Sequence, residues 1–83
     1  MNMTTYTEIY RETRCNPDNT LFYTVIVNAP ETYQFPYLLT IEEGETHGEK
    51  YDRRHTILAE NDKAPAIRHA MKILDNAKFK ENK

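Results

Sequence analysis

The alternation of hydrophobic and polar positions predicts four strands followed by one helix. The clearest strand is LFYTVIVNA, residues 21–29, a run of β-branched and aromatic side chains. YLLTIEE (37–43) and KYDRRHTILA (50–59) have the same character, and the region from Gly44 to Gly48 separates them. The loop PETYQFP, residues 30–36, is bracketed by two prolines, which a central strand does not accommodate.

The first segment, TTYTEIYRETR (4–14), fits either a strand or a helix. Thr, Tyr and Ile favour a strand, whereas Thr5-x-x-Glu8 is a capping-box pattern at the start of a helical spacing. We prefer the strand because CNPDNT (15–20) follows, and Pro17 presets the backbone of a turn. Residues 4–14 and 21–29 then form a β-hairpin. Alternation places Tyr6, Glu8 and Tyr10 on one face of its first strand.

The C-terminal segment predicts an amphipathic helix. Asn61 or Asp62 caps it, and Pro65 fits its first turn, where an N–H has no helical partner. The apolar stripe consists of Ile67, Ala70, Met71 and Leu74. The predicted fold class is therefore α+β: an antiparallel sheet of about four strands with one C-terminal amphipathic helix packed on one face. Residues 1–83 form a single domain, with frayed ends at 1–3 and 79–83.

The second strand is apolar on both of its faces. Leu21, Tyr23, Val25 and Val27 alternate with Phe22 and Ile26, and a single helix covers only one face of a sheet. We therefore expect the second face to be covered by the 30–36 loop, by a second copy in a homodimer, or by a partner.

Composition indicates a cytoplasmic protein. Cys15 is the single cysteine, the N-terminus lacks the features of a signal peptide, and no apolar run is long enough to cross a membrane. The net charge of −2 is unevenly distributed. Acids cluster between Glu42 and Glu49, whereas residues 62–83 hold six Lys/Arg against three acids.

Metal binding and catalysis are not expected. His47 and His55, with Glu49 and Asp52 between them and His69 on the helix, lack the ligand spacings of zinc sites. No histidine is near Cys15 in sequence, and two glycines provide no phosphate-binding loop. The sequence thus predicts a protein that is not an enzyme and has no cofactor.

Nucleic-acid binding is the alternative function. The strands followed by the Ala-rich helix NDKAPAIRHAMKIL resemble, in outline only, double-stranded-RNA-binding and sheet-type DNA-binding domains. The lysine cluster that grips phosphate at the start of such a helix is missing here. Arg54, Arg68 and Lys72 would form a basic stripe if the last strand and the helix bring them together, while the acidic run would repel phosphate.

Protein binding is the leading hypothesis, because Tyr and Arg are enriched at interfaces. Alternation groups Tyr51, Arg53 and His55, and the proline-bracketed loop presents Tyr33 and Phe35. Short chains poor in glycine and cysteine are common among phage and mobile-element proteins that inhibit host machinery. We therefore expect a small non-enzymatic inhibitor or adaptor that blocks a protein surface.

Overall fold

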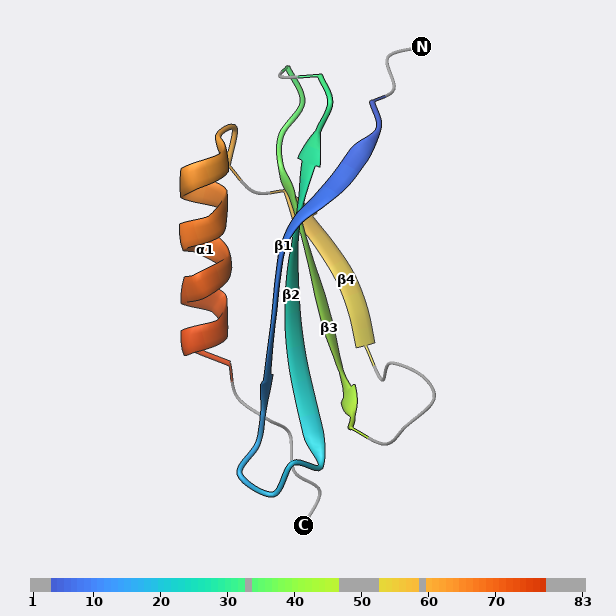
Figure 1. Ribbon diagram of the computed structural model, residues 1–83, viewed down its shortest axis with the longest axis vertical. Coiled ribbons are helices and arrows are strands. Elements are labelled where there is room, and N and C mark those ends of the chain that lie inside the picture. Colours follow the sequence, from blue (N-terminus) through green and yellow to red (C-terminus); the bar gives the residue numbers. More distant parts are fainter. Residues whose placement is uncertain (1–3, 33, 47–52, 59, 78–83) are drawn as a thin grey trace.

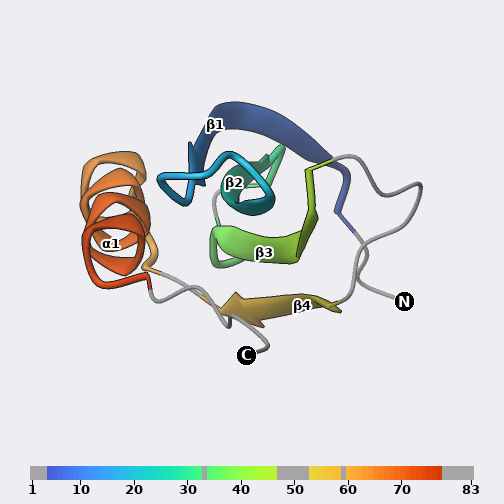
Figure 2. The ribbon, with the colours of Figure 1, turned by 90° about the horizontal axis from the view of Figure 1, so that it is seen from below.

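The computed structural model describes residues 4–32, 34–46, 53–58 and 60–77. It contains strands β1 (Tyr6–Cys15), β2 (Leu21–Pro30), β3 (Leu38–Glu45) and β4 (Arg53–Leu58), followed by helix α1 (Lys63–Asp75). The strands form one antiparallel sheet in the order β1-β2-β3-β4, with α1 packed on one face (Figures 1 and 2). The predicted α+β fold is confirmed. The predicted frayed ends lie outside the described residues.

The β1–β2 hairpin is built around Asn16. Its buried side chain accepts hydrogen bonds from the backbone N–H groups of Thr20 (2.8 Å) and Leu21 (3.0 Å). The N–H of Asn19 donates to the Asn16 carbonyl at 2.9 Å, which closes the turn over Pro17. Asn19 has a φ of 57°, a left-handed conformation that asparagine tolerates better than most residues. This local turn chemistry explains why residues 6–15 form a strand and not a helix.

A β-bulge at Ile9 changes the face assignment within β1. Glu8 pairs with Asn28 and Tyr10 pairs with Val27, so β1 carries one extra residue. Ile9 and Tyr10 both pack against the core below the helix. The expectation that Glu8 and Tyr10 share a face is therefore wrong, because the extra residue reverses the alternation between them.

The core lies between α1 and the middle strands. Its buried residues come from β2, β3 and the helix: Val25, Val27, Leu39, Ile41, Ala66, Ala70 and Leu74. Ala66 and Ala70 are fully buried, and their small side chains allow α1 to lie close to the valines of β2. In this orientation Ile73 packs against the core and Met71 is 48% exposed. The predicted stripe is wrong at Met71 because the helix is rotated toward its alanines.

Some predicted element boundaries shift. β2 extends to Pro30, which pairs only with Tyr6 of β1, because the pairing of β2 with β3 ends at Asn28. Proline is tolerated there because only one neighbouring strand is present. β3 runs through Gly44 to Glu45. Residues 50–52 and 59 of the predicted fourth strand lie outside the described residues.

The sheet face opposite α1 is not a bare apolar surface. Ile26 is 4% exposed, and its buried neighbours on this face are polar: Thr24, Thr40 and Glu42. Ile26 of this face is therefore buried within the single chain, without a second copy or a partner. The predicted homodimer stays a prediction. No described helix is long and apolar enough to span a bilayer.

Candidate functional site

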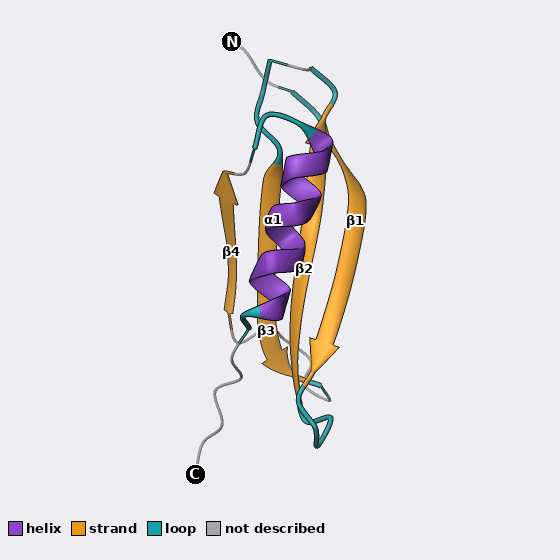
Figure 3. Cartoon of the chain, turned by 90° about the vertical axis from the view of Figure 1, so that its left-hand side faces the viewer, coloured by secondary structure: helices purple, strands orange, loops and turns teal. Residues whose placement is uncertain are grey.

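A groove of about 710 Å³ runs along α1 on the helix side of the sheet. Most of its lining comes from α1 and the residue that ends it, and the remainder from β2 and the segment after β4. We call it the α1 groove; its lining residues are Tyr23, Glu60, Pro65, Arg68, His69, Lys72, Ile73 and Asn76. The helical residues lie on one side of α1 because they repeat at intervals of three and four. Figure 3 shows α1 lying over β2 and β3, with β1 and β4 to either side.

The apolar part of the groove is formed by Tyr23 and Ile73. Both side chains are half-buried and pack against the hydrophobic core. Pro65, in the first turn of the helix, adds a third apolar surface. Tyr23 and Ile73 thus contact the core and also line the groove.

The charged part of the groove is formed by Arg68 and Lys72, which are exposed and one helical turn apart. Neither side chain forms an ion pair within the described part of the chain. Glu60, which is also exposed, is the acidic residue of the lining. The lining therefore holds two cationic side chains and one carboxylate, and its net charge is positive.

His69 adds an unsatisfied polar atom to the lining. Its Nδ1 is buried and has no hydrogen-bond partner among the described residues. A buried nitrogen without a partner costs about 1–3 kcal/mol, and native proteins rarely leave such groups. The groove thus combines an apolar wall with two cations and one carboxylate.

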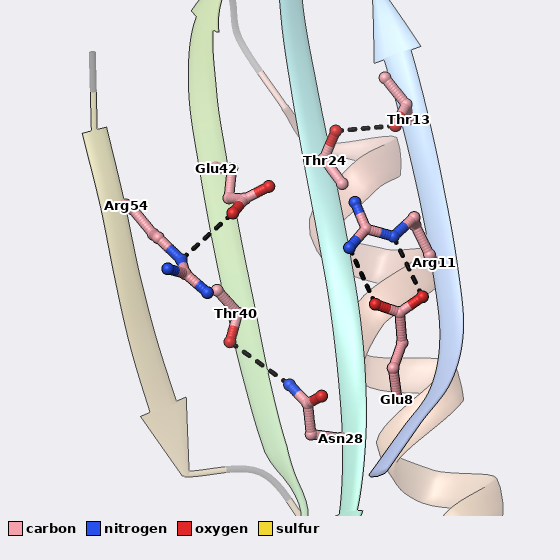
Figure 4. Close-up of polar contacts among 8 residues, drawn as sticks. All are labelled: Glu8, Arg11, Thr13, Thr24, Asn28, Thr40, Glu42 and Arg54. Atoms are coloured by element: carbon pink, nitrogen blue, oxygen red, sulfur yellow. Dashed lines mark hydrogen bonds and ion pairs between the residues drawn. The ribbon is translucent and has the colours of Figure 1, made fainter. Parts of the chain in front are cut away.

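The opposite sheet face carries polar groups that are paired with one another (Figure 4). Arg54 Nε donates to Glu42 Oε2 at 3.1 Å, and the Glu42 side chain is 5% exposed. The Thr13 and Thr24 hydroxyls lie 2.7 Å apart. The Thr40 hydroxyl lies 3.2 Å from that of Thr56 and accepts from Asn28 Nδ2 at 3.5 Å. These groups satisfy each other, which leaves this face little capacity to attract a charged ligand.

The bulge at Ile9 also produces an ion pair on this face. Arg11 donates to both carboxylate oxygens of Glu8, at 2.8 and 3.1 Å. In a regular strand, residues three apart point to opposite sides, and the extra residue brings these two together. The hydrogen bond from Arg11 lowers the pKa of Glu8 from its ordinary value. Tyr10 instead packs against the core on the helix side. Burial and the nearby Glu12 carboxylate raise the pKa of Tyr10.

The structure separates the residues predicted to bind nucleic acid. Arg68 and Lys72 line the α1 groove, but Arg54 lies on the opposite face and pairs with Glu42. Arg54 of the last strand therefore does not form a continuous basic stripe with Arg68 and Lys72 of the helix.

The structure describes only some of the residues that were predicted to bind a protein. His55 is exposed and pairs in register with Ile41, which belongs to the core, so His55 lies on the helix side. The backbone of Arg53 lies opposite Glu43 in the register of β3 and β4. Phe35 is half-buried in the loop before β3, far along that strand from the Glu43 pair. Tyr33 and Tyr51 lie outside the described residues.

No cluster of three or more potential metal ligands occurs in the ranges that the structure describes. His47, Glu49 and Asp52, which were considered and rejected as metal ligands from the sequence, lie outside them. Cys15 is exposed and unpaired with another cysteine, and its neighbour Arg14 bonds to Glu12 (3.3 Å) and Asp75 (3.2 Å). The absence of metal and of catalysis stays a prediction.

Sequence reasoning missed Tyr23, His69 and Ile73 as site residues. A signal was present in the helix, because Pro65, His69, Lys72 and Asn76 recur at helical spacing beside the core stripe. The contribution of Tyr23 depends on how the helix docks on β2, which no local pattern shows.

Comparison with known protein families, with curated proteins and with solved structures finds no match for this chain.

Proposed function

We propose that this chain is a small non-enzymatic protein-binding module that engages its partner through the α1 groove. The observation that carries the proposal is the combination of Tyr23 and Ile73 with Arg68 and Lys72 in the lining of one shallow groove. Aromatic and arginine side chains are the types that contribute most binding free energy at protein interfaces. The module acts by occupying a surface of its partner, as an inhibitor or adaptor.

The competing proposal, nucleic-acid binding, is supported by Arg68 and Lys72 but weakened by the rest of the charge distribution. Phosphate binding gains from several cations along a continuous track. Glu60 shares the groove with the two cations, and Arg11, Arg14 and Arg54 are each paired with a carboxylate. A partner with mixed apolar and polar chemistry fits this site better than a phosphate backbone.

Affinity capture from the native host tests the proposal with matched baits. The wild-type chain and the Arg68→Glu/Lys72→Glu variant are compared after nuclease treatment, with Lys63→Glu as a control. Lys63 is exposed and lies on the same helix but does not line the groove. We expect one protein to bind the wild type and Lys63→Glu and to be lost from the double variant.

The captured protein is then purified, and its affinity is measured by calorimetry. Arg54→Ala, on the opposite face, should leave that affinity unchanged. Capture that is abolished by nuclease, or equal capture by the double variant, would contradict the proposal.

A further inference from the structure

We propose that the α1 groove binds an acidic segment of the partner protein, in which a carboxylate lies next to an apolar side chain. This inference rests on the proposed protein-binding function and specifies the chemistry of the bound segment. The inference follows from a difference among the cations of the described residues: some form ion pairs with carboxylates of the chain, and Arg68 and Lys72 do not.

The cations of the groove differ from those of the sheet. Arg11 pairs with Glu8, Arg14 with Glu12 and Asp75, and Arg54 with Glu42. Arg68 and Lys72 form no ion pair within the described residues, and they lie one turn apart on an exposed side of α1. A guanidinium binds a carboxylate through two parallel hydrogen bonds, and an ammonium adds a point charge beside it. A glutamate or aspartate is the side chain that complements this pair.

The position of Glu60 restricts where the acid is bound. Glu60 lies in the segment after β4, and its backbone carbonyl accepts a hydrogen bond from Tyr37, which fixes it beside the sheet. Its carboxylate repels a bound acid, so the acid lies at Arg68 and Lys72 and not beside Glu60.

The apolar requirement follows from Tyr23 and Ile73. Both are supported by the core and present half-buried surface to the groove. An apolar side chain placed on them is removed from water, which stabilises binding by about 25 cal/mol per Å² of apolar surface. His69 lies between Arg68 and Lys72 along the helix and also lines the groove.

A random peptide library displayed on phage tests this chemistry directly. Selection is made on the immobilised wild-type chain, with depletion on Arg68→Glu/Lys72→Glu and a parallel selection on Lys63→Glu. We expect enriched peptides to carry Asp or Glu beside an aromatic or aliphatic residue, with the same motif from wild type and Lys63→Glu. Circular dichroism and thermal melting show whether the double variant folds, and Arg68→Ala/Lys72→Ala provides a milder replacement.

The best peptide is then synthesised with its acids replaced by the matching amides. We expect an affinity loss of at least about tenfold, equivalent to about 1.4 kcal/mol, measured by fluorescence anisotropy. Moderate salt should weaken the acidic peptide and leave the amide version nearly unchanged.

The possible failures are distinguishable. A groove-dependent motif without acids overturns the acidic segment but leaves the protein-binding function in place. If no peptide depends on Arg68 and Lys72 and affinity capture also finds no protein, the proposed function is wrong as well. Binding of labelled oligo(dT) or duplex RNA that is lost in the double variant assigns the groove to nucleic acid and overturns both.

Discussion

The two faces of the sheet are buried by different chemistry. On the helix side, Val25, Val27, Leu39 and Ile41 pack against α1 in an apolar core. On the opposite side, Thr24, Thr40 and Glu42 are nearly as buried, but they are held by hydroxyl contacts and an ion pair. Burial alone therefore does not identify the binding face. The helix side is distinguished by two cations of α1, Arg68 and Lys72, that form no ion pair within the described residues.

The largest effect on stability is expected for Leu39→Ala, on the helix side. Leu39 is fully buried, and its truncation leaves a cavity between β3 and α1. We expect a loss of about 2–5 kcal/mol in the free energy of unfolding, measured by urea denaturation. Met71→Ala is the control because Met71 is exposed, and its change should stay within about 0.5 kcal/mol. Similar losses for both would show that the apolar core lies elsewhere.

A smaller effect is expected for Arg54→Ala on the opposite face. The Glu42 carboxylate, which is 5% exposed, would lose its cation. Because Arg54 itself is 60% exposed and water screens the pair, we expect a loss of about 1–2 kcal/mol. Adding Glu42→Gln removes the buried charge and should recover most of that loss. A double variant no more stable than Arg54→Ala would show that Glu42 does not depend on this cation.

Thr40→Val tests the hydroxyl network without changing the shape of the side chain. The variant removes the contact to Thr56 at 3.2 Å and the acceptor for Asn28 at 3.5 Å. We expect a loss of about 1 kcal/mol in urea denaturation. Thr56→Val, which leaves the Asn28 bond intact, should cost less. A stabilised Thr40→Val variant would mean that this face tolerates an apolar core.

The smallest effect is expected for the exposed Glu8–Arg11 pair and should depend on pH. Because the pKa of Glu8 is lowered in the folded state, its contribution is present above the unfolded pKa, near 4.5, and is lost as the pH falls through the folded pKa. Wild type and Glu8→Gln should therefore differ slightly in urea midpoint at neutral pH and converge in acid. A difference that grows in acid would have the wrong sign.

The sequence was sufficient to predict the four strands, the hairpin and the helix because their signals are local. The Asn16–Pro17 turn and the alternation of β2 depend on neighbouring residues only. The bulge at Ile9 was not predictable, since one unpaired residue leaves no mark on the hydrophobic pattern. It reversed the expected faces of Glu8 and Tyr10.

The site was less predictable than the fold. Arg68 and Lys72 could be proposed from their spacing, but the separation of Arg54 from them depends on strand register. The rotation that exposes Met71 and brings Ile73 inward depends on how closely Ala66 and Ala70 approach β2. These features arise when α1 docks on the sheet, and no segment encodes them alone.

The order β1-β2-β3-β4 has a consequence for how the chain folds. Each strand pairs with the strand that precedes or follows it, so the sheet can form by successive closure of short loops. Helix α1 instead contacts β2, which lies far back along the chain. We expect docking of α1 to be a late kinetic step that mutations at Ala66 or Ala70 would affect mainly through the unfolding rate. The groove would then exist only in chains that have completed folding, which makes partner binding a readout of the native state.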